Sequence, residues 1–533
     1  MRVKIFGSAG AGKTTTTSEL ATEIVRKEEG NFENVYGLSL TRAAKWSLIG
    51  KLARDDQDRK ILSENILTLH SFAYRRFKAE DNSIRIADLK TIGEFFTERG
   101  LEFRVDEEIS EDFDTAYGFV DLSKYEGNRL YQFFITIRLS LMHLSIHRIS
   151  KFINKYQEEL PVSGKNFINL LQDFLTWLRE NNIWDFTRLL TELYKRKDIA
   201  LEGLLLIVDE AQDIAPINAE LLTRYLDNFK YVIIAGDDDQ AIFSFASATP
   251  DFMLNTPVNK EIILPVSYRL PRAIWKLARK IIDQNRNRKY KDFKPRNEEG
   301  FVDYLYSVDD TLERILKHKD KGERIFILTR NRVYLQSWVS ALENSDIPYT
   351  VIGKGQKLPT KLIRQLRTVL HIKEGKTISE DVAFELIRFL KIGRIKGTTH
   401  AKIAKVLSQV HTSGYSSSTP EGKIVKFILE SPIDRIFARE DRQTLYMWWR
   451  RVKNIDEWSN PKIKLGTIHS AKGLEADVVV LDHRITRRVY DEAMNDIELE
   501  RRVAYVGVTR ARQSLYLVRP PGGNYDYFNL GIL

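Results

Sequence analysis

A glycine-rich loop near the start of the chain constrains the fold more than any other feature. The sequence Gly7-Ser-Ala-Gly-Ala-Gly-Lys13-Thr14 follows an apolar strand and comes before a helix, which is the context that a phosphate-binding loop requires. Glycines let successive backbone N–H groups curl around phosphates, and the helix N-terminus adds its positive end. We expect Lys13 to reach the β- and γ-phosphates and the Thr14 hydroxyl to ligate Mg²⁺.

Composition narrows the class of protein. At 533 residues the chain is too long for one hydrophobic core. A net charge of +10 favours polyanionic partners, although a basic surface without such a partner is the alternative. The absence of cysteine excludes disulfides and thiolate zinc sites, and the histidines show no metal-ligand spacing, so we expect no metal beyond nucleotide-bound Mg²⁺. No apolar run is long enough to span a membrane, and Met1 leads directly into the first strand, so we expect a cytoplasmic protein without a signal peptide.

Strands and helices alternate in four parts of the chain, residues 2–87, 204–264, 270–353 and 464–519. This alternation predicts parallel α/β sheets. The expected apolar strands are residues 3–6, 35–40, 66–69, 204–208, 231–235, 261–264, 324–328 and 349–352. Residues 88–200 and 354–461 instead carry apolar side chains at helical spacing. The economical interpretation is two α/β domains, each interrupted by a mainly helical insertion.

Carboxylates follow two of the apolar strands. Asp209 and Glu210 end the strand at 204–208, where Asp209 would bind the metal and Glu210 would polarise a water for attack on the γ-phosphate. Gly236-Asp-Asp-Asp-Gln240 ends the strand at 231–235, at the edge where doubly wound sheets bind ligands. Gln240 is a candidate sensor of the γ-phosphate. Phe243 and Phe245 would offer stacking surfaces to bases, although isolated aromatic residues more often belong to a core.

Residues 464–481, KIKLGTIHSAKGLEADVV, form the most informative string after the phosphate-binding loop. The pattern predicts a strand, a turn that carries Thr467, His469 and Ser470, and a second strand. Packing alone does not require such a string. Thr68-Leu-His-Ser71 echoes Thr467-Ile-His-Ser470, and each follows an apolar strand. Matching positions in two domains of one fold would produce this echo, and so would chance.

These motifs, taken in order, resemble those of superfamily 1A DNA helicases of the UvrD/Rep/PcrA family over nearly the whole chain. Besides the phosphate-binding loop, the matching segments are residues 40–44 (LTRAA), 68–72 (TLHSF), 209–213 (DEAQD), 236–247 (GDDDQAIFSFAS), 267–269 (SYR), 467–475 (TIHSAKGLE) and 499–511 (LERRVAYVGVTRA). The resemblance implies an α/β fold of two RecA-like P-loop NTPase domains that bind ATP and Mg²⁺ in the cleft between them.

The resemblance also assigns roles by position. It implies that hydrolysis depends on Lys13, Glu210, Gln240, Arg269 and Arg510, with both arginines reaching the γ-phosphate from the second domain. The nucleotide would be bound by Gly7, Gly10, Gly12, Lys13, Thr14, Thr15, Tyr268, which would stack on adenine, and Glu475, which would bind the ribose. Mg²⁺ would be held by Thr14 and Asp209. Single-stranded DNA would contact Thr41, Thr68, His70, Phe72, Phe245, Thr467 and His469.

The implied domains follow the same resemblance. Domain 1A would comprise residues 1–90 and 201–266, with the helical insertion 1B at 91–200. Domain 2A would comprise residues 267–355 and 462–533, with a reduced helical insertion 2B at 356–461. The implied function is that of an ATP-dependent, monomeric DNA helicase that translocates 3′→5′ on single strands and acts at junctions of single- and double-stranded DNA.

Some positions depart from the family pattern. The family's glutamine motif has no counterpart before Met1, and Thr15 stands where an arginine is frequent, so selectivity for adenine stays open. Phe245-Ala246 replaces a Trp-Arg pair. The short second insertion leaves processivity open. The basic and aromatic run at residues 286–296 (RNRKYKDFKPR) fits either a nucleic-acid groove or a solvated loop.

The sequence also bears on four alternative functions. A helicase–nuclease is disfavoured because only about 20 residues follow Arg512. A translocase that strips proteins from DNA, and movement on RNA instead of DNA, both stay open. A nucleotide-gated DNA clamp or recruitment factor is the alternative from another class. The presence of Glu210, Arg269 and Arg510 argues against such a clamp, because a protein that hydrolyses slowly would be free to lose them.

Overall fold

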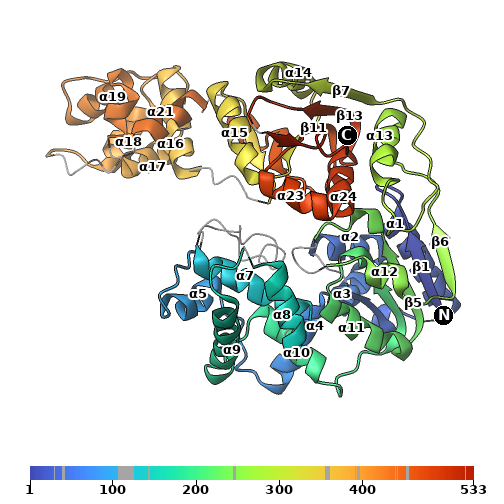
Figure 1. Cartoon of the computed structure of the whole chain (residues 1–533). Coiled ribbons are helices and arrows are strands. Elements are labelled where there is room, and N and C mark those ends of the chain that lie inside the picture. Colours follow the sequence, from blue (N-terminus) through green and yellow to red (C-terminus); the bar gives the residue numbers. More distant parts are fainter. Residues whose placement is uncertain are drawn as a thin grey trace. The chain divides into compact units, whose positions relative to one another are not determined.

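The computed structural model describes the chain except for residues 29, 39–41, 106–124, 142–144, 158, 244–247, 354–359, 391, 393–395, 439, 441, 452–454 and 523. The chain forms two compact units (Figure 1). The larger unit comprises Met1–Trp338, Ile352–Lys354 and Leu465–Leu533, and the smaller comprises Val339–Val351 and Gly355–Lys464. In the described part of the chain, no helix is both long and apolar enough to cross a membrane.

The first sheet has six parallel strands in the order β3-β2-β4-β5-β1-β6. Alternate residues of its strands belong to two different hydrophobic cores, since Leu206 and Val208 pack into one and Leu205 and Ile207 into the other. The sheet is therefore covered on both faces, which explains its continuous apolar strands. The strands are β1 Arg2–Phe6, β2 Val35–Leu38, β3 Ile66–Leu67, β4 Gly203–Val208, β5 Phe229–Gly236 and β6 Lys260–Ile263.

Two groups of helices accompany this sheet. Those close to its strands in sequence are α1 Lys13–Lys27, α2 Arg42–Leu52, α3 Asp56–Asn65, α4 Leu69–Glu80, α11 Pro216–Tyr225 and α12 Asp251–Asn255. Between β3 and β4 the chain adds α5 Leu89–Thr97, α7 Glu126–Leu139, α8 Ile146–Lys155, α9 Gly164–Glu180 and α10 Phe186–Lys195. Aromatic rings, among them Phe95, Phe96 and Phe174, fill the interior of this second group. A buried bidentate salt bridge between Arg138 and Asp185, with N–O distances of 2.6 and 2.9 Å, connects α7 to the N-terminus of α10.

The second sheet has the strand order β7-β13-β11-β8-β10-β9, and its neighbours from β7 to β8 run parallel. Its strands are β7 Phe301–Leu305, β8 Ile325–Thr329, β9 Tyr349–Val351, β10 Ile463–Thr467, β11 Ala476–Asp482 and β13 Ala511–Val518. The helices of this part are α13 Arg272–Ile282, α14 Val308–Asp320, α15 Leu335–Asn344, α23 Arg487–Asn495 and α24 Ile497–Val508. A short antiparallel pair, β12 Arg484–Ile485 with β14 Tyr525–Asp526, holds the C-terminal segment.

The smaller unit is mainly helical, with a core of its own. Leu366, Leu386, Leu407, Val425 and Trp458 are buried in that core. Its helices are α16 Thr360–Lys373, α17 Glu380–Phe389, α18 His400–Ser408, α19 Pro420–Glu430, α20 Ile433–Ile436, α21 Arg442–Arg451 and α22 Ile455–Ser459.

The predicted fold class is confirmed, because two parallel sheets alternate with helices and each is interrupted by a helical stretch. The strand expected at residues 66–69 ends at Leu67, because Thr68 caps α4 through its hydroxyl, which accepts from Ser71 N–H at 3.1 Å. The end of the strand expected at 35–40 lies outside the described residues. The sequence pattern did not indicate β7, an edge strand whose aromatic residues Phe301 and Tyr304 are exposed.

Candidate nucleotide and nucleic-acid sites

The phosphate-binding loop leads from β1 into α1 and has the expected backbone. Gly12 has φ +82° and caps α1, a left-handed conformation that glycine adopts without strain. Lys13 Nζ donates to the carbonyl oxygen of Gly7 at 3.0 Å, so its ammonium lies back over the loop. The buried hydroxyl of Ser8 has no hydrogen-bond partner among the described residues. Curled backbone, ammonium and unsatisfied hydroxyl together fit a bound polyphosphate.

Two carboxylates stand at the end of β4. Burial and the neighbouring Glu210 raise the pKa of Asp209. Burial also acts to raise the pKa of Glu210, but Lys13 and Lys472 outweigh it, so the pKa of Glu210 lies below its ordinary value. Glu210 has φ +53°, an uncommon backbone conformation for a residue with a side chain, which turns the chain sharply after the strand. A buried oxygen ligand beside a charged carboxylate suits Mg²⁺ and an activated water.

Gln240 lies at the end of β5 and is held on several sides. Its Nε2 donates to Asp237 Oδ2 at 2.7 Å, and its Oε1 accepts from Arg510 Nη2 at 2.9 Å. Its backbone carbonyl accepts from Lys472 Nζ at 2.6 Å, and Lys472 also pairs with Asp213. Burial raises the pKa of Asp213 to about 6, although Lys472 opposes the shift. Lys472 lies within the TIHSAKGLE segment, but the sequence pattern indicated no role for it.

Arg510 is a buried cation whose partners are neutral. Besides Gln240, its guanidinium donates to the carbonyl oxygens of Val506 at 2.9 Å and Leu474 at 3.2 Å. Burial and the positive charge of Arg269 lower the pKa of Arg510 to about 9, so it remains charged at neutral pH. Since none of these partner atoms carries a charge, the guanidinium is well placed to receive an anion.

Arg269 is paired with Glu475. Its Nε donates to Glu475 Oε2 at 2.7 Å, and Arg512 contacts the other oxygen of this carboxylate at 2.6 Å. The charges of Arg269 and Arg512 outweigh burial and hold the pKa of Glu475 below its usual value. Arg269 therefore has a carboxylate partner on Nε and a carbonyl partner, Thr509, on Nη1, in contrast to Arg510, whose partners are neutral.

The segment before Arg269 is attached to the phosphate-binding loop. Tyr268 N–H donates to the carbonyl oxygen of Gly10 at 2.9 Å, and Ser267 Oγ donates to that of Ala9 at 2.6 Å. A Cβ on Gly10 would lie 2.3 Å from Arg269 Cβ, so only glycine allows this approach. The Tyr268 side chain lies beside Gly12 and is 69% exposed. An exposed aromatic ring next to the loop suits stacking on a base.

Thr15 has an unexpected cationic neighbour. Lys51 Nζ, from α2, donates to Thr15 Oγ1 at 2.6 Å. The positive charge of Lys51 also acts on Asp209. A cation therefore lies next to Thr15, although Thr15 itself stands where the family frequently has an arginine. Lys51 belongs to no motif and lies 36 residues from Thr15, so the sequence offered no signal for this contact.

The echo between Thr68 and Thr467 is structural. Each threonine hydroxyl accepts from the backbone N–H three residues later, at 3.1 Å in Ser71 and 3.2 Å in Ser470. The same hydroxyl cap thus occurs at the ends of β3 and β10, where it begins helix α4 in the first case and a turn in the second. The histidine of each segment meets an aromatic ring, His70 with Phe186 and His469 with Phe243, at 6.3 and 6.4 Å between centroids.

Of the other residues predicted to contact DNA, the structure describes only Phe72. Phe72 packs edge-on against Tyr225, at 6.2 Å between ring centroids, and is partly buried. Thr41 and Phe245 lie outside the described residues.

His70 and His469, which the sequence predicts as DNA contacts, lead to an expectation for how DNA binding responds to pH. Burial lowers the pKa of His70 to about 3, and burial with the charges of Arg330 and Lys472 lowers that of His469 well below 6.5. Both rings are therefore neutral above pH 6. We expect the affinity for a fluorescent single-stranded oligonucleotide to change less than about twofold between pH 8 and pH 6 at constant ionic strength. A steady tightening as the pH falls through 6.5 would show that these rings become charged.

The lowered pKa of His70 also makes the free energy of unfolding depend on pH. A histidine whose pKa is depressed by folding contributes stability above the unfolded pKa near 6.5, and this contribution is lost as the pH falls towards the folded value of about 3. The variant His70→Gln should therefore lose less stability than the unchanged protein between pH 6.5 and pH 4, measured by urea unfolding.

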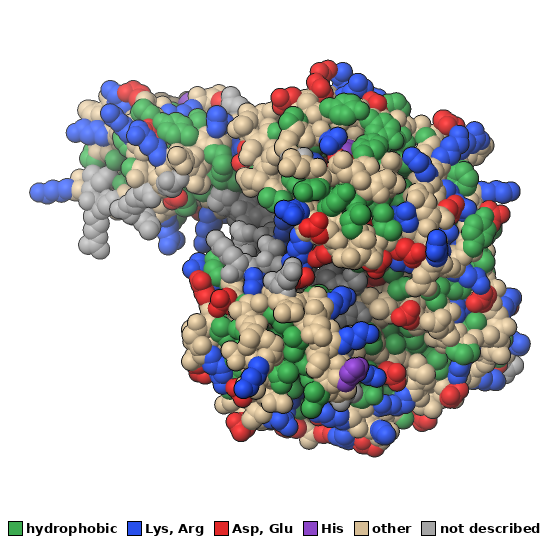
Figure 2. All heavy atoms as spheres, in the orientation of Figure 1, with side chains coloured by type: hydrophobic (Ala, Val, Ile, Leu, Met, Phe, Trp, Pro, Cys, Tyr) green, Lys and Arg blue, Asp and Glu red, His purple; other side chains and the backbone are tan. Residues whose placement is uncertain are grey.

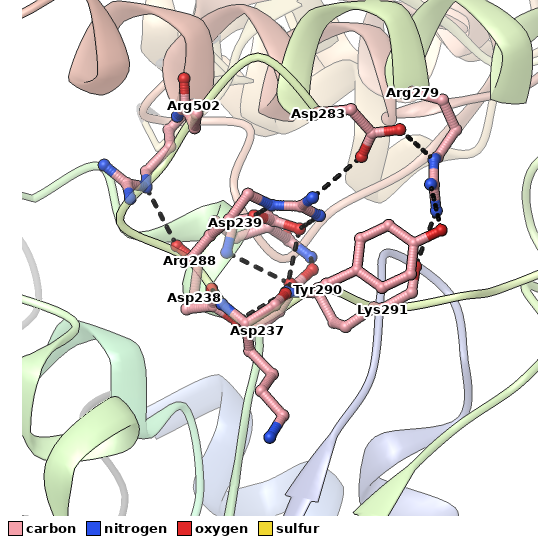
Figure 3. Close-up of polar contacts among 12 residues, drawn as sticks. Asp237, Asp238, Asp239, Arg279, Asp283, Arg288, Tyr290, Lys291 and Arg502 are labelled. Carbon is pink, nitrogen blue, oxygen red and sulfur yellow. Dashed lines mark hydrogen bonds and ion pairs between the residues drawn. The ribbon is translucent and has the colours of Figure 1, made fainter.

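The basic run at residues 286–296 is partly a solvated loop, since Arg286 and Tyr290 are exposed, but two of its cations are buried. Arg288 is buried at 5% exposure and Lys291 at 0%, and both pair with the carboxylates of residues 237–239 (Figure 3). The charges of these two side chains are paired inside the protein, so neither side chain lines a groove or faces solvent. Three consecutive buried carboxylates require nearby positive charge, and this requirement explains where the run lies.

Comparisons with known proteins agree with this geometry. Residues 1–260 match the UvrD/REP helicase N-terminal domain and residues 450–519 the UvrD-like helicase C-terminal domain, together more than half of the chain. A probable DNA helicase II homolog of Mycoplasma capricolum is 22% identical over 99% of this chain and 83% of its own length. The ATP-dependent DNA helicase Rep of Buchnera aphidicola is 22% identical over 96% of this chain and 91% of its own. The ATP-dependent DNA helicase PcrA of Staphylococcus epidermidis is 23% identical over 58% of this chain and 54% of its own length.

Proposed function

Because the chain belongs to the UvrD/Rep/PcrA family of ATP-dependent DNA helicases, we propose that it moves 3′→5′ along single-stranded DNA, as a monomer in the cytoplasm, and opens the duplexes it meets. Residues 1–90 and 201–266 would form domain 1A, and residues 267–355 and 462–533 domain 2A. The helical stretches 91–200 and 356–461 would be their insertions.

Hydrolysis is proposed to use residues from both sheets. Lys13 would bind the β- and γ-phosphates, and Glu210 would orient and deprotonate the attacking water. Mg²⁺, held by Thr14 and Asp209, would neutralise charge on the phosphates. Arg510 and Arg269 would stabilise the charge that develops on the transferred phosphoryl group, which makes hydrolysis depend on both domains.

The base and ribose are proposed to bind beside the loop. Tyr268 would stack on the base, and Glu475 would accept a hydrogen bond from the ribose once Arg269 has turned to the phosphate. Thr15, with Lys51 behind its hydroxyl, would line the same site. Guanine would meet the same ring, so ATP and GTP need to be compared directly.

The track is proposed to lie along the segments after β3 and β10. Thr68, His70 and Phe72 would contact DNA from the first sheet, and Thr467 and His469 from the second. Neutral histidines and hydroxyls read backbone and stacking faces, so we expect weak sequence preference. Phosphate contacts from basic side chains would make the affinity fall steeply with salt.

One observation carries this proposal. The amide of Gln240, after β5 of the first sheet, accepts directly from Arg510, which comes just before β13 of the second sheet. Lys472 bridges to Asp213 and to the Gln240 carbonyl. A γ-phosphate would compete for the same donors. Nucleotide state would therefore change the contacts between the two sheets, and this is how hydrolysis would be converted into stepping.

Strand displacement on tailed duplexes tests the function. The substrates carry a 3′ or a 5′ single-stranded tail, in DNA and in RNA, and are assayed with ATP and with GTP. We expect displacement from 3′-tailed DNA with ATP and not from 5′-tailed DNA. DNA-stimulated hydrolysis without displacement would instead favour a protein-stripping translocase. Slow hydrolysis that DNA does not stimulate would favour a nucleotide-gated clamp or recruitment factor.

A further inference from the structure

Three consecutive carboxylates, Asp237, Asp238 and Asp239, are fully buried after β5 (Figure 3). Buried carboxylates are stable only when they are paired. Two cations of the basic segment, which we define as residues 286–296, supply this pairing. Lys291 Nζ lies 3.3 Å from Asp237 Oδ1, 2.5 Å from Asp238 Oδ1 and 2.9 Å from Asp239 Oδ2.

The basic segment comes from the connection between α13 and β7 and lies against the first sheet. Val266 and Lys294 form a parallel bridge, and Ser267 N–H donates to the Lys294 carbonyl at 2.9 Å. Lys289 Nζ reaches Glu261 of β6 at 2.5 Å. The segment is thus bound to the same connection that carries Tyr268 and Arg269.

The two buried cations contact different carboxylates. Arg288 forms a bidentate salt bridge with Asp239, with N–O distances of 2.6 and 2.7 Å, and a further ion pair with Asp283 at 2.9 Å. Among the ion pairs of the described residues, Lys291 is the one that reaches Asp237. Burial lowers the pKa of Lys291, but Asp239, Asp237 and Asp238 outweigh it, so the pKa is raised and the ammonium stays charged.

Asp237 connects Lys291 to the proposed phosphate sensor. Its Oδ1 faces Lys291, while its Oδ2 accepts from Gln240 Nε2 at 2.7 Å. A carboxylate can only accept from an amide NH₂, so this contact directs the Gln240 nitrogen towards Asp237. The amide oxygen is then directed at Arg510, whose guanidinium can only donate. Both ends of the Gln240 side chain are fixed by this sequence of contacts.

We propose that Lys291 is a positioning residue for ATP hydrolysis, which fixes the Gln240 amide through Asp237. The inference rests on the proposed function, since it needs Gln240 to act on the γ-phosphate. Without the ammonium, Asp237 Oδ1 keeps its contact with the N–H of Asp239, at 3.3 Å, but the carboxylate loses its charged partner and can take up a proton. A protonated carboxyl would donate to the oxygen of a reversed Gln240 amide. A reversed amide would present its oxygen to Asp237 and its NH₂ to the guanidinium of Arg510, which also only donates, so the contact with Arg510 would be lost.

A double-mutant cycle between Lys291 and Gln240 tests this role. The variants Lys291→Met, Gln240→Ala and the double variant are compared for DNA-stimulated hydrolysis and for ATP affinity. We expect Lys291→Met to lower kcat about tenfold, with KM for ATP changed less than about threefold. In the Gln240→Ala background the same change should lower kcat less than about twofold, because no amide remains to be positioned. Lys291→Arg should restore most of kcat.

Arg288→Met is the matched control, because it removes a buried cation of the same cluster that does not contact Asp237. Its effect should be the same with and without Gln240. If Lys291→Met does not fold, the cycle is run with Lys291→Met combined with Asp238→Asn, which removes one carboxylate together with the ammonium. Additive effects of Lys291 and Gln240, or an unchanged kcat, would overturn the inference. If the unchanged protein lacks DNA-stimulated hydrolysis, it is the proposed function that fails.

Discussion

Replacing Lys13 by alanine is expected to lower DNA-stimulated ATP hydrolysis by at least about a thousandfold. Lys13 Nζ lies 3.0 Å from the carbonyl oxygen of Gly7, within the loop that is proposed to bind the phosphates. No other described ammonium lies within the phosphate-binding loop, so the charge that develops in phosphoryl transfer would lose its partner there. Release of inorganic phosphate with saturating single-stranded DNA measures the effect.

The same variant should still bind DNA. Lys13 is the first residue of α1, and the proposed DNA contacts lie after β3 and β10 instead. The affinity of nucleotide-free protein for an oligonucleotide should therefore stay within about twofold of the original. Lys27→Ala, at the exposed C-terminal end of the same helix, is the matched control and should keep full activity. Retention of DNA-stimulated hydrolysis in Lys13→Ala would refute the assigned site.

Replacing Arg510 by methionine is expected to lower kcat between about a hundredfold and a thousandfold. The guanidinium is fully buried, and its partners among the described residues are neutral oxygens of Gln240, Leu474, Val506 and Thr509. The neutral contacts offset little of the cost of burying the charge, whereas a γ-phosphate would pair with it directly. Arg510 should therefore contribute mainly to the transition state and little to the nucleotide-free fold.

Because Arg510 is expected to act on the transition state and not on the nucleotide-free fold, the stability of Arg510→Met is a second test. Unfolding of the nucleotide-free variant should require the same free energy as the original within about 1 kcal/mol, because no ion pair is broken. A non-hydrolysable ATP analogue should raise the Tm of the variant less than that of the original. Arg487→Met, which removes a 78% exposed arginine of α23, is the control and should change neither quantity. A variant that loses several kcal/mol of stability but keeps kcat would show that Arg510 is a structural residue.

The sequence predicted those features that depend on local patterns. Apolar strands that end in Gly7, Asp209 and Gly236 could be recognised because strands buried on both faces are continuously apolar. The echo between Thr68 and Thr467 was also visible in the sequence, because a threonine hydroxyl that caps the following residues requires a fixed local spacing. The two parallel sheets followed from these segments.

Contacts between residues far apart in the chain could not be predicted. Lys291 pairs with carboxylates more than 50 residues earlier, and Lys472 reaches Asp213 over 259 residues. A lysine in a run of basic residues is usually solvated, so composition pointed away from burial. The cluster became interpretable only when the structure showed three carboxylates that needed compensation. The edge strand β7 was missed because its exposed aromatic residues lack the pattern of a buried strand.

Directional movement driven by hydrolysis is tested most directly by displacement of streptavidin from biotinylated single-stranded DNA. A motor that moves 3′→5′ runs towards the 5′ end, so ATP should release streptavidin from a 5′ biotin much faster than spontaneous dissociation. Release from a 3′ biotin should stay near the spontaneous rate, and Lys13→Ala should release neither. Equal release from both ends, faster release from the 3′ end, or release without ATP would contradict the account.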